Sequence, residues 1–195
     1  MVDMAKAFGV FANMGERKEI TSLIKIKDSF EDTLYENNSN GNRVLDPKIS
    51  YIITDILSDN IARTPAFGPR SALEIPGYRV AVKTGTTDQK KDNWTIGYTP
   101  EFMVVVWVGN NDNTPMHPSL TSGVTGAAPI WNRVMTYLLQ NYSHTKTWFS
   151  QPNGLISKTC YGGRTEYFLP GTENKVSCAR FSLTPSPTIS PSPSP

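Results

Sequence analysis

The residues with the clearest chemical potential form one short run, Lys83-Thr84-Gly85-Thr86-Thr87. A lysine ammonium beside threonine hydroxyls can bind an anionic group such as a carboxylate. A glycine lets a ligand approach the backbone, because no Cβ stands in the way. Backbone N–H groups beyond the glycine can donate to a substrate carbonyl or to an oxyanion. The run therefore predicts a strand end that holds a peptide by strand pairing and supports acyl transfer.

The triplet Lys-Thr-Gly is weak evidence by itself. A Lys-[Ser/Thr]-Gly triplet arises by chance in roughly one chain in ten of this size. The alternative interpretation is an ordinary turn that carries a solvated lysine and a glycine. The context favours a site, since alternating apolar residues predict an amphipathic strand that ends at Lys83. Two more apolar strands, over residues 94–98 and 102–108, complete an antiparallel meander.

Further elements are predicted around these strands. One helix is expected over residues 3–14 and a small hairpin over residues 20–35. A second helix begins at Asp46-Pro47 and ends at Asp59-Asn60, and a long loop containing Pro65 follows it. The expected apolar stripe of this helix comprises Ile49, Ile53, Ile56 and Leu57.

The last predicted helix covers residues 127–140, and the strand before it is apolar throughout. That strand is expected to be buried on both faces. The expected buried face of the helix comprises Ile130, Trp131, Val134 and Leu138. The order helix, hairpin, helix, three strands, helix predicts an α+β fold with an antiparallel sheet flanked by helices.

Composition excludes several functions. A net charge of +2 gives no basic field for nucleic acid. The longest apolar run near the strands has seven residues, too few to span a bilayer. His117 and His144 share no acidic or cysteine cluster, so neither a metal nor another cofactor is predicted. Either the protein is soluble and cytosolic, or it is a piece of a longer chain with a targeting segment upstream.

The C-terminal part differs in character from the rest. The predicted regions are a main domain at 1–141, a small cysteine-containing appendage at 142–181 and a disordered Ser/Thr/Pro tail at 182–195. Cys160 and Cys178 lie outside the predicted helices and strands, which favours a disulfide in an oxidising compartment. The alternative is two unpaired thiols.

The sequence from Val80 to Asn113 resembles the third-motif region of class A penicillin-binding proteins, the bifunctional peptidoglycan synthases. The matching pieces are Lys83–Thr87, Trp94, Gly97–Pro100 and Trp107–Gly109. The stretches LDPKISYIITDILSDN and GAAPIWNRVM resemble helices of the same family, and the resemblance covers roughly residues 1–180. It implies a partial penicillin-binding-protein transpeptidase fold, similar to serine β-lactamases, from the C-terminal part of that domain.

The resemblance also implies a reaction. In the family a serine attacks the D-Ala-D-Ala end of a stem peptide, and a second stem peptide's amine accepts the acyl group. Lys83 and Thr86 would then be catalytic, with the Thr86 N–H forming half of an oxyanion hole. The implied substrate-binding residues are Thr84, Gly85, Thr86 and Thr87. The implied partners are stem peptides, a lipid-linked precursor and, as covalent inhibitors, β-lactams. The implied location is the extracytoplasmic membrane face, through an anchor upstream.

The family's S-x-x-K and S-x-N motifs occur here only as spacings. Ser22 and Lys25 lie in a predicted strand, where they face opposite sides. Ser143 and Lys146 follow the last helix, and Ser58-Asp59-Asn60 lies at a helix end. The chain alone is therefore expected to lack the nucleophile and to be inactive. Two alternatives stay open: a non-catalytic wall-binding module and a β-lactamase-like hydrolase.

Overall fold

The computed structural model describes residues 1–38, 40–117, 124–144, 147–175 and 178. Contacts divide the chain into two compact units, Met1–Asn153 and Gly154–Pro195. The first unit ends later than the predicted domain end at residue 141, because Trp148 and Phe149 pack against first-unit side chains. The predicted tail at 182–195 lies outside the described residues.

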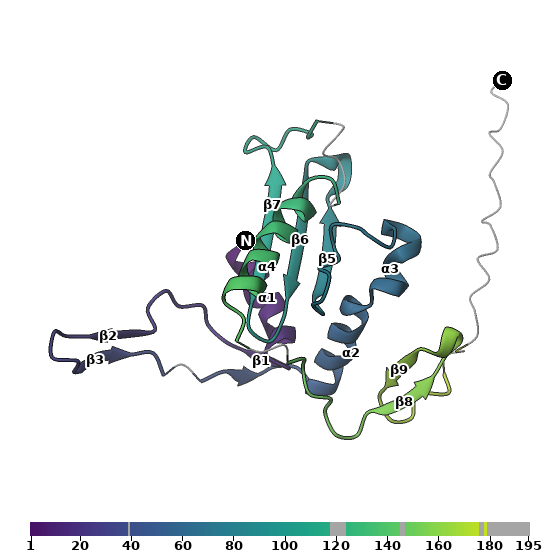
Figure 1. Ribbon diagram of the computed structural model, residues 1–195, viewed down its shortest axis with the longest axis horizontal. Coiled ribbons are helices and arrows are strands. Elements are labelled where there is room, and N and C mark those ends of the chain that lie inside the picture. The colour runs from purple at the N-terminus through teal and green to yellow at the C-terminus, as the bar shows by residue number, and fades with distance from the viewer. Residues whose placement is uncertain (39, 118–123, 145–146, 176–177, 179–195) are drawn as a thin grey trace. The chain divides into compact units, whose positions relative to one another are not determined.

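The first unit is built on a three-stranded antiparallel sheet (Figure 1). Its strands are β5 (Ala81–Thr86), β6 (Asp92–Tyr98) and β7 (Met103–Gly109), in the order β5-β6-β7. A short turn, Thr99–Phe102, joins β6 to β7, and the β5–β6 connection contains the 3₁₀ turn η1 (Asp88–Lys90). The predicted meander is confirmed, and β5 forms one edge of the sheet.

Helices cover both faces of this sheet. Helix α4 (Ala127–Asn141) packs on the face that carries Val82 and Val104, with Trp131 completely buried against it. The opposite face meets α1 (Val2–Ala12) and α2 (Pro47–Ser58). The α+β class, an antiparallel sheet flanked by helices, is confirmed. The largest buried apolar cluster comprises Leu73, Ile75, Val80, Val82, Val104, Ala128, Trp131, Met135 and Leu139.

Helix α2 begins where the sequence predicts. The Asp46 carboxylate accepts from the Lys48 N–H at 2.7 Å, and Pro47 occupies the first turn. Of its predicted apolar stripe, Ile49, Ile53 and Leu57 are half-buried, but Ile56 is exposed. The buried residues of the helix are Ser50, Tyr51 and Thr54. Polar residues can occupy this face because tertiary partners satisfy them, which periodicity does not reveal.

Helix α3 (Asn60–Phe67) replaces the first part of the predicted long loop. The Asp59 carboxylate caps it by accepting from the Ala62 N–H at 2.8 Å. Pro65 lies inside the helix, and Gly68 ends it with a φ of 78°. The sequence predicts a loop here, whereas in the structure Asp59 ends α2 and begins α3 at once.

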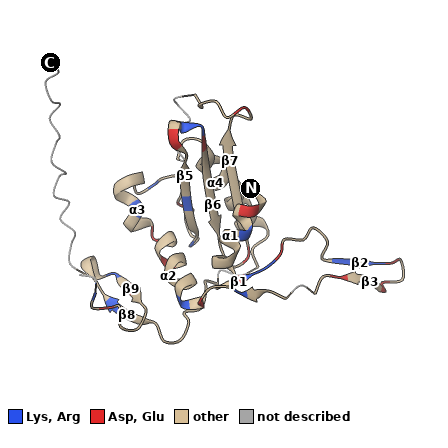
Figure 2. Ribbon diagram, turned by 180° about the vertical axis from the view of Figure 1, so that it is seen from behind, with Lys and Arg blue, Asp and Glu red and all other residues tan. Residues whose placement is uncertain are grey.

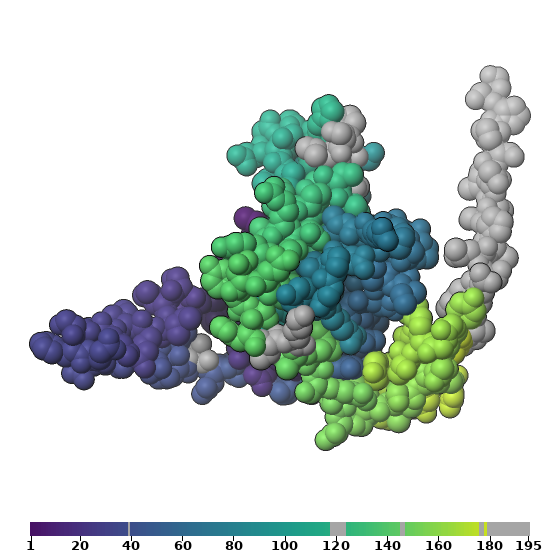
Figure 3. All heavy atoms as spheres, viewed as in Figure 1, coloured from purple at the N-terminus to yellow at the C-terminus, as the bar shows by residue number. Residues whose placement is uncertain are grey.

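Two predictions of burial are wrong in part. In β7 only Val104 is buried, because β7 is the other edge of the sheet and its remaining residues are half-exposed. In α4, Trp131 is buried and Leu138 packs against the core as predicted, but Ile130 is 49% and Val134 is 43% exposed. The helix is rotated so that Trp131, Met135 and Leu139 face the sheet, and its outer face forms part of the surface seen in Figure 3.

Two small ladders precede the main sheet. Strand β1 (Glu16–Arg17) pairs with β4 (Asn42–Arg43), and β2 (Lys25–Lys27) pairs with β3 (Thr33–Glu36). The β2–β3 hairpin confirms the prediction for residues 20–35. It lies away from the three-stranded sheet in Figure 1, and all its strand residues are exposed.

The second unit contains one more hairpin. Strand β8 (Ile156–Thr159) pairs with β9 (Thr165–Phe168), and the 3₁₀ turn η3 (Tyr161–Gly163) connects them. Cys160 and Cys178 form a disulfide with a Cα–Cα distance of 4.7 Å. The predicted pairing is therefore present, and the alternative of two unpaired thiols is not.

Candidate functional site

The Lys-Thr-Gly run lies on an exposed edge of the main sheet. It forms the second half of β5, which pairs only with β6 within the three-stranded sheet. Lys83 and Thr86 are exposed, while Thr84 and Gly85 are half-exposed. The structure thus brings the four predicted residues together on a strand that offers its outer side to a ligand.

The ladder register shows which backbone groups point outward. The Thr87 N–H donates to the Asp92 carbonyl at 3.1 Å, so Thr87 and Asp92 form a hydrogen-bonded pair. Such pairs alternate with non-bonded pairs along an antiparallel ladder. Thr86, which is paired with Asn93, therefore directs its N–H toward the outer edge of β5. This is the direction that an oxyanion donor needs.

The side chains of the run divide between the two faces of β5. Thr84 and Thr86 lie on the same face as Val82, which is the face of α4. Lys83 and Gly85 lie on the opposite face. The Lys83 ammonium donates to the Thr84 carbonyl, an acceptor at the outer edge. The positive charge is thereby held at the edge that a pairing peptide would occupy.

Packing among the described residues does not require a glycine at position 85. A Cβ built there meets only the Trp94 Cβ, at an ordinary 3.8 Å, and its φ is not in the left-handed region. Gly97 is different, because its Cβ would lie 2.3 Å from the Trp131 ring. A side chain at position 85 would therefore have space on the face of β5 that carries Lys83, and the role of Gly85 toward a ligand stays a prediction.

Thr87 stands apart from the other predicted residues. Its hydroxyl accepts from the Asp92 N–H at 3.1 Å, and its N–H donates to the Asp92 carbonyl. These bonds close the β5–β6 connection, in which Gln89 and Lys90 have φ values of 60° and 56°. Thr87 thus shapes the end of the strand next to the candidate site.

Buried polar contacts fix the other end of the same strand pair. Tyr98 is completely buried, and its hydroxyl lies 2.9 Å from the Thr54 hydroxyl on α2. Burial raises the pKa of Tyr98 to about 12, and the Thr54 hydrogen bond opposes that shift in part. The sequence analysis missed Thr54, since nothing in a helical pattern marks a threonine that will meet a strand tyrosine.

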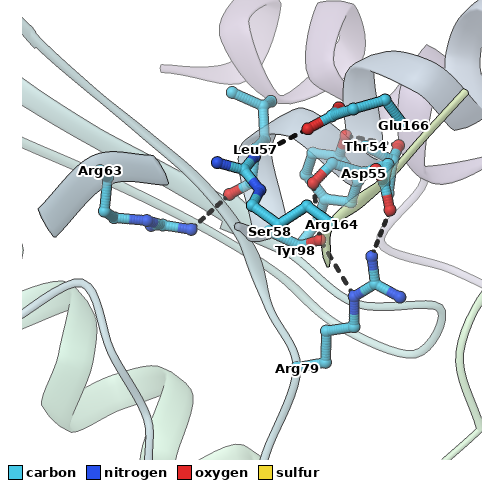
Figure 4. A network of polar contacts seen from close by, with 9 residues as sticks. All are labelled: Thr54, Asp55, Leu57, Ser58, Arg63, Arg79, Tyr98, Arg164 and Glu166. Atoms are coloured by element: carbon cyan, nitrogen blue, oxygen red, sulfur yellow. Dashed lines mark hydrogen bonds and ion pairs between the residues drawn. The ribbon is translucent and has the colours of Figure 1, made fainter. Parts of the chain in front are cut away.

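Arg79 joins α2 to the start of β5 (Figure 4). Its guanidinium pairs with the Asp55 carboxylate and donates to the Ser58 hydroxyl at 3.0 Å. The same guanidinium lies 4.4 Å from the centre of the Trp148 ring, a cation–π contact. Residues from α2, from the approach to β5 and from the segment after α4 therefore meet around Arg79.

The residues that only match the S-x-x-K and S-x-N spacings have other interaction partners. Ser58 is held by Arg79 and by the Asp55 carbonyl, and the Asn60 amide donates to the Pro69 carbonyl at 3.1 Å. Lys25 pairs with Glu36 across the exposed hairpin. Ser143 donates to the Glu101 carboxylate. Lys146 lies outside the described residues.

Other candidate sites are not supported in the described ranges. Within them, no group of three histidine, cysteine or acidic residues could hold a metal ion. No helix of this part of the chain has the length and apolar character that a membrane crossing requires. Charges of both signs are spread over the elements in Figure 2. A hollow of about 440 Å³ between α1 and the β6–β7 turn is lined by residues other than those of the Lys-Thr-Gly run.

Comparison with known families decides the assignment. Residues 1–136 match the family described as the penicillin binding protein transpeptidase domain. The chain belongs to this family. The resemblance that the Lys-Thr-Gly strand and its flanking motifs suggested is thereby confirmed, and the exposed strand β5 lies within the matched residues.

Individual relatives are class A penicillin-binding proteins. Penicillin-binding protein 1A of Clostridium acetobutylicum is 32% identical over 185 residues, which are 93% of this chain and 22% of the relative. Penicillin-binding protein 1A of Pseudomonas aeruginosa is 34% identical over 134 residues, which are 68% of this chain and 15% of the relative. The chain spans about a fifth of the length of such relatives.

Solved structures share the fold. The crystal structure of penicillin-binding protein 1A from Haemophilus influenzae has a TM-score of 0.74 at 24% identity, over 88% of this chain and 32% of that one. The PonA1 protein of Mycobacterium tuberculosis in complex with penicillin V has a TM-score of 0.59 at 24% identity, over 77% and 41% of the two chains. The penicillin-binding transpeptidase fold is thus shown for this chain in part.

Proposed function

We propose that this chain supplies the Lys-Thr-Gly side of the active site of a peptidoglycan D,D-transpeptidase. One observation carries the proposal: Lys83, Gly85 and Thr86 lie on an exposed edge strand whose Thr86 N–H points outward. An extended stem peptide can pair with that edge. Membership of the penicillin-binding protein transpeptidase family supports the same assignment.

In the proposed reaction a serine oxygen forms an ester with the penultimate D-alanine carbonyl. The peptide bond breaks, and the terminal D-alanine leaves with the proton. The amine of a second stem peptide then attacks the ester, which forms the cross-link and restores the serine. The Thr86 N–H stabilises the oxyanion, Lys83 attracts the terminal carboxylate, and the hydroxyls of Thr84 and Thr86, which share one face of β5, bind that carboxylate.

The nucleophilic serine is proposed to lie outside residues 1–195. Ser22 precedes the exposed strand β2, and Ser143 follows α4, so neither begins a helix with a lysine one turn later. The longer protein is proposed to act at the extracytoplasmic face of the membrane, with a glycosyltransferase region, a lipid-linked precursor as substrate and β-lactams as covalent inhibitors. The chain alone is proposed to be inactive.

Labelling with a fluorescent penicillin tests the proposal. The full-length protein should form a stable adduct on a serine outside residues 1–195, and the isolated chain should form none. Lys83→Ala should slow adduct formation about 100-fold or more, because a preorganised donor is lost. Lys25→Ala is the matched control. It removes the lysine of the chance S-x-x-K spacing and should leave the rate of adduct formation unchanged.

Other outcomes would favour the alternatives. An adduct mapped to Ser22 or Ser143 of the isolated chain would contradict the location of the nucleophile. Hydrolysed penicillin in large excess over the protein would indicate a β-lactamase-like hydrolase. Absence of any adduct on the full-length protein, together with binding to purified peptidoglycan, would indicate a wall-binding module.

A further inference from the structure

Asn93 is a buried polar residue directly behind the candidate site. Its side chain is completely inaccessible to solvent. The Oδ1 atom accepts from the Ala127 N–H at 2.8 Å, and the Nδ2 atom lies 3.8 Å from the Met116 sulfur. One strand amide therefore contacts both the start of α4 and the segment that follows β7.

Helix α4 depends on this amide for its first turn. The first N–H groups of a helix have no partner within the helix. The residue before α4, Gly126, has no side chain to supply one, and no side-chain cap of its own is present. Asn93 supplies the acceptor from the neighbouring strand. A buried helix start is thus capped by β6 rather than by its own sequence.

The close approach also explains the glycine at position 126. A Cβ there would lie 2.4 Å from the Asn93 Nδ2 atom and 2.7 Å from its Oδ1 atom. The Gly126 φ of −97° is available to any residue, so contact rather than backbone conformation excludes a side chain. The Asn93 amide therefore fits against the start of α4 only while position 126 is a glycine.

Asn93 lies opposite Thr86 in the β5–β6 ladder. Because the next pair, Thr87 and Asp92, is hydrogen-bonded, Thr86 and Asn93 form a non-bonded pair with closely spaced side chains. Both side chains point to the face of α4. Any shift of β6 at Asn93 would thus move the backbone of Thr86, whose N–H is the proposed oxyanion donor.

We propose that Asn93 is a positioning residue for Thr86. By capping α4 from β6, it fixes the strand pair at the position where the Thr86 N–H must point outward. The proposal rests on the proposed transpeptidase function for its effect on rate. Asn93 itself does not face the outer edge of β5, so it acts through Thr86 and not on the substrate.

The first test compares two lost helix caps in the full-length protein. Asn93→Ala removes the α4 cap next to Thr86, and Asp46→Ala removes the α2 cap outside the candidate site. Both should lower the unfolding midpoint. Asn93→Ala should also slow acylation by a fluorescent penicillin about tenfold or more at a temperature where all variants are folded. Asp46→Ala should leave that rate within twofold.

A second test examines the contact between Asn93 and the start of α4. Gly126→Ala should lower the unfolding midpoint strongly in the native background, because the new methyl group meets the Asn93 amide. In the Asn93→Ala background the same change should have a much smaller effect, since the amide is gone. Additive effects of the two substitutions on the unfolding midpoint would contradict a direct contact between Asn93 and position 126.

Amide hydrogen exchange separates this proposal from the proposed function. Exchange of the Thr87 N–H, which donates to Asp92, should be at least tenfold faster in Asn93→Ala than in Asp46→Ala. Equal exchange, or equal acylation rates in the two variants, would overturn the positioning role. A native protein that takes no penicillin label would contradict the proposed function alone, and the exchange result would still decide the role of Asn93.

Discussion

Two glycines in the same strand pair have different surroundings. Gly97, in β6, lies in the core, where a Cβ would come within 2.3 Å of the Trp131 ring and 2.9 Å of the Ala81 carbonyl oxygen. Gly85, in β5, would accept a Cβ at ordinary contact distance from Trp94. Gly97 is therefore required by the packing of α4 on the sheet, whereas the described residues leave room for a methyl group at Gly85.

The comparison extends to the two ends of the β5–β6 ladder. At the Ala81 end, Tyr98 is buried and bonded to α2. At the Thr86 end, the outer edge is exposed, and the inner side is anchored through Asn93. A rigid inner side with an open outer side is the arrangement that a preorganised donor needs. The atoms proposed to bind the ligand and the atoms that stabilise the ladder thus lie on different sides of it.

Gly97→Ala should have the largest effect on the fold. The new methyl group meets an aromatic ring that is itself completely buried, and a backbone carbonyl oxygen that cannot retreat without disturbing β5. Unfolding of the chain in urea should show a loss of about 3 kcal/mol or more. A loss below about 1 kcal/mol would mean that α4 can move away from the sheet and that the contrast between the glycines is wrong.

Gly85→Ala should leave stability within about 0.5 kcal/mol of the native value, because the methyl group has space and no left-handed backbone is required. Acylation of the full-length protein by a fluorescent penicillin should nevertheless slow about 100-fold, since the methyl group displaces the ligand from the edge. Native acylation by this variant would show that Gly85 does not face the ligand.

Tyr98→Phe should destabilise the chain by about 1–2 kcal/mol, because the Thr54 hydroxyl loses its buried partner. It should also remove a pH dependence. The folded-state pKa of Tyr98 is about 12, above the ordinary value of 10.0, so its contribution is complete below pH 10 and is lost as the pH rises toward 12. Urea midpoints measured between pH 9 and 12 should fall more steeply for the native chain than for the variant.

The site strand was predictable, because its signals are local. Alternation defines β5, and the Lys-Thr-Gly run marks its end. The run itself predicted that N–H groups beyond Gly85 can donate to a ligand, and the family resemblance singled out Thr86. The ladder register directs the Thr86 N–H outward. The roles of these residues in catalysis stay predictions, since their test needs the reacting partner.

The anchoring residues were not predictable from local pattern. Thr54 and Asn93 are polar, yet both are completely buried, because each meets a partner that is distant in the sequence. Periodicity assigned Ile130 and Val134 to the core, whereas the rotation of α4 is set by the fit of Trp131 over Gly97. Contacts between secondary-structure elements decide which of these residues are buried, and such contacts cannot be seen in a single sequence.

Arg79→Ala should have the smallest effect on stability. It tests whether the contacts of Arg79 help to hold the buried end of the β5–β6 ladder. The guanidinium contacts Asp55, Ser58 and the Trp148 ring, but its side chain is 44% exposed, so solvent weakens its ion pair. We expect a loss of about 1 kcal/mol, mainly from the cation–π contact. Arg70→Ala, a change at an exposed loop arginine, is the control and should cost less than half as much. If both variants unfold at the native urea concentration, the segment around Trp148 does not help to hold β5, and the buried end of the ladder is maintained by Tyr98 and the core alone.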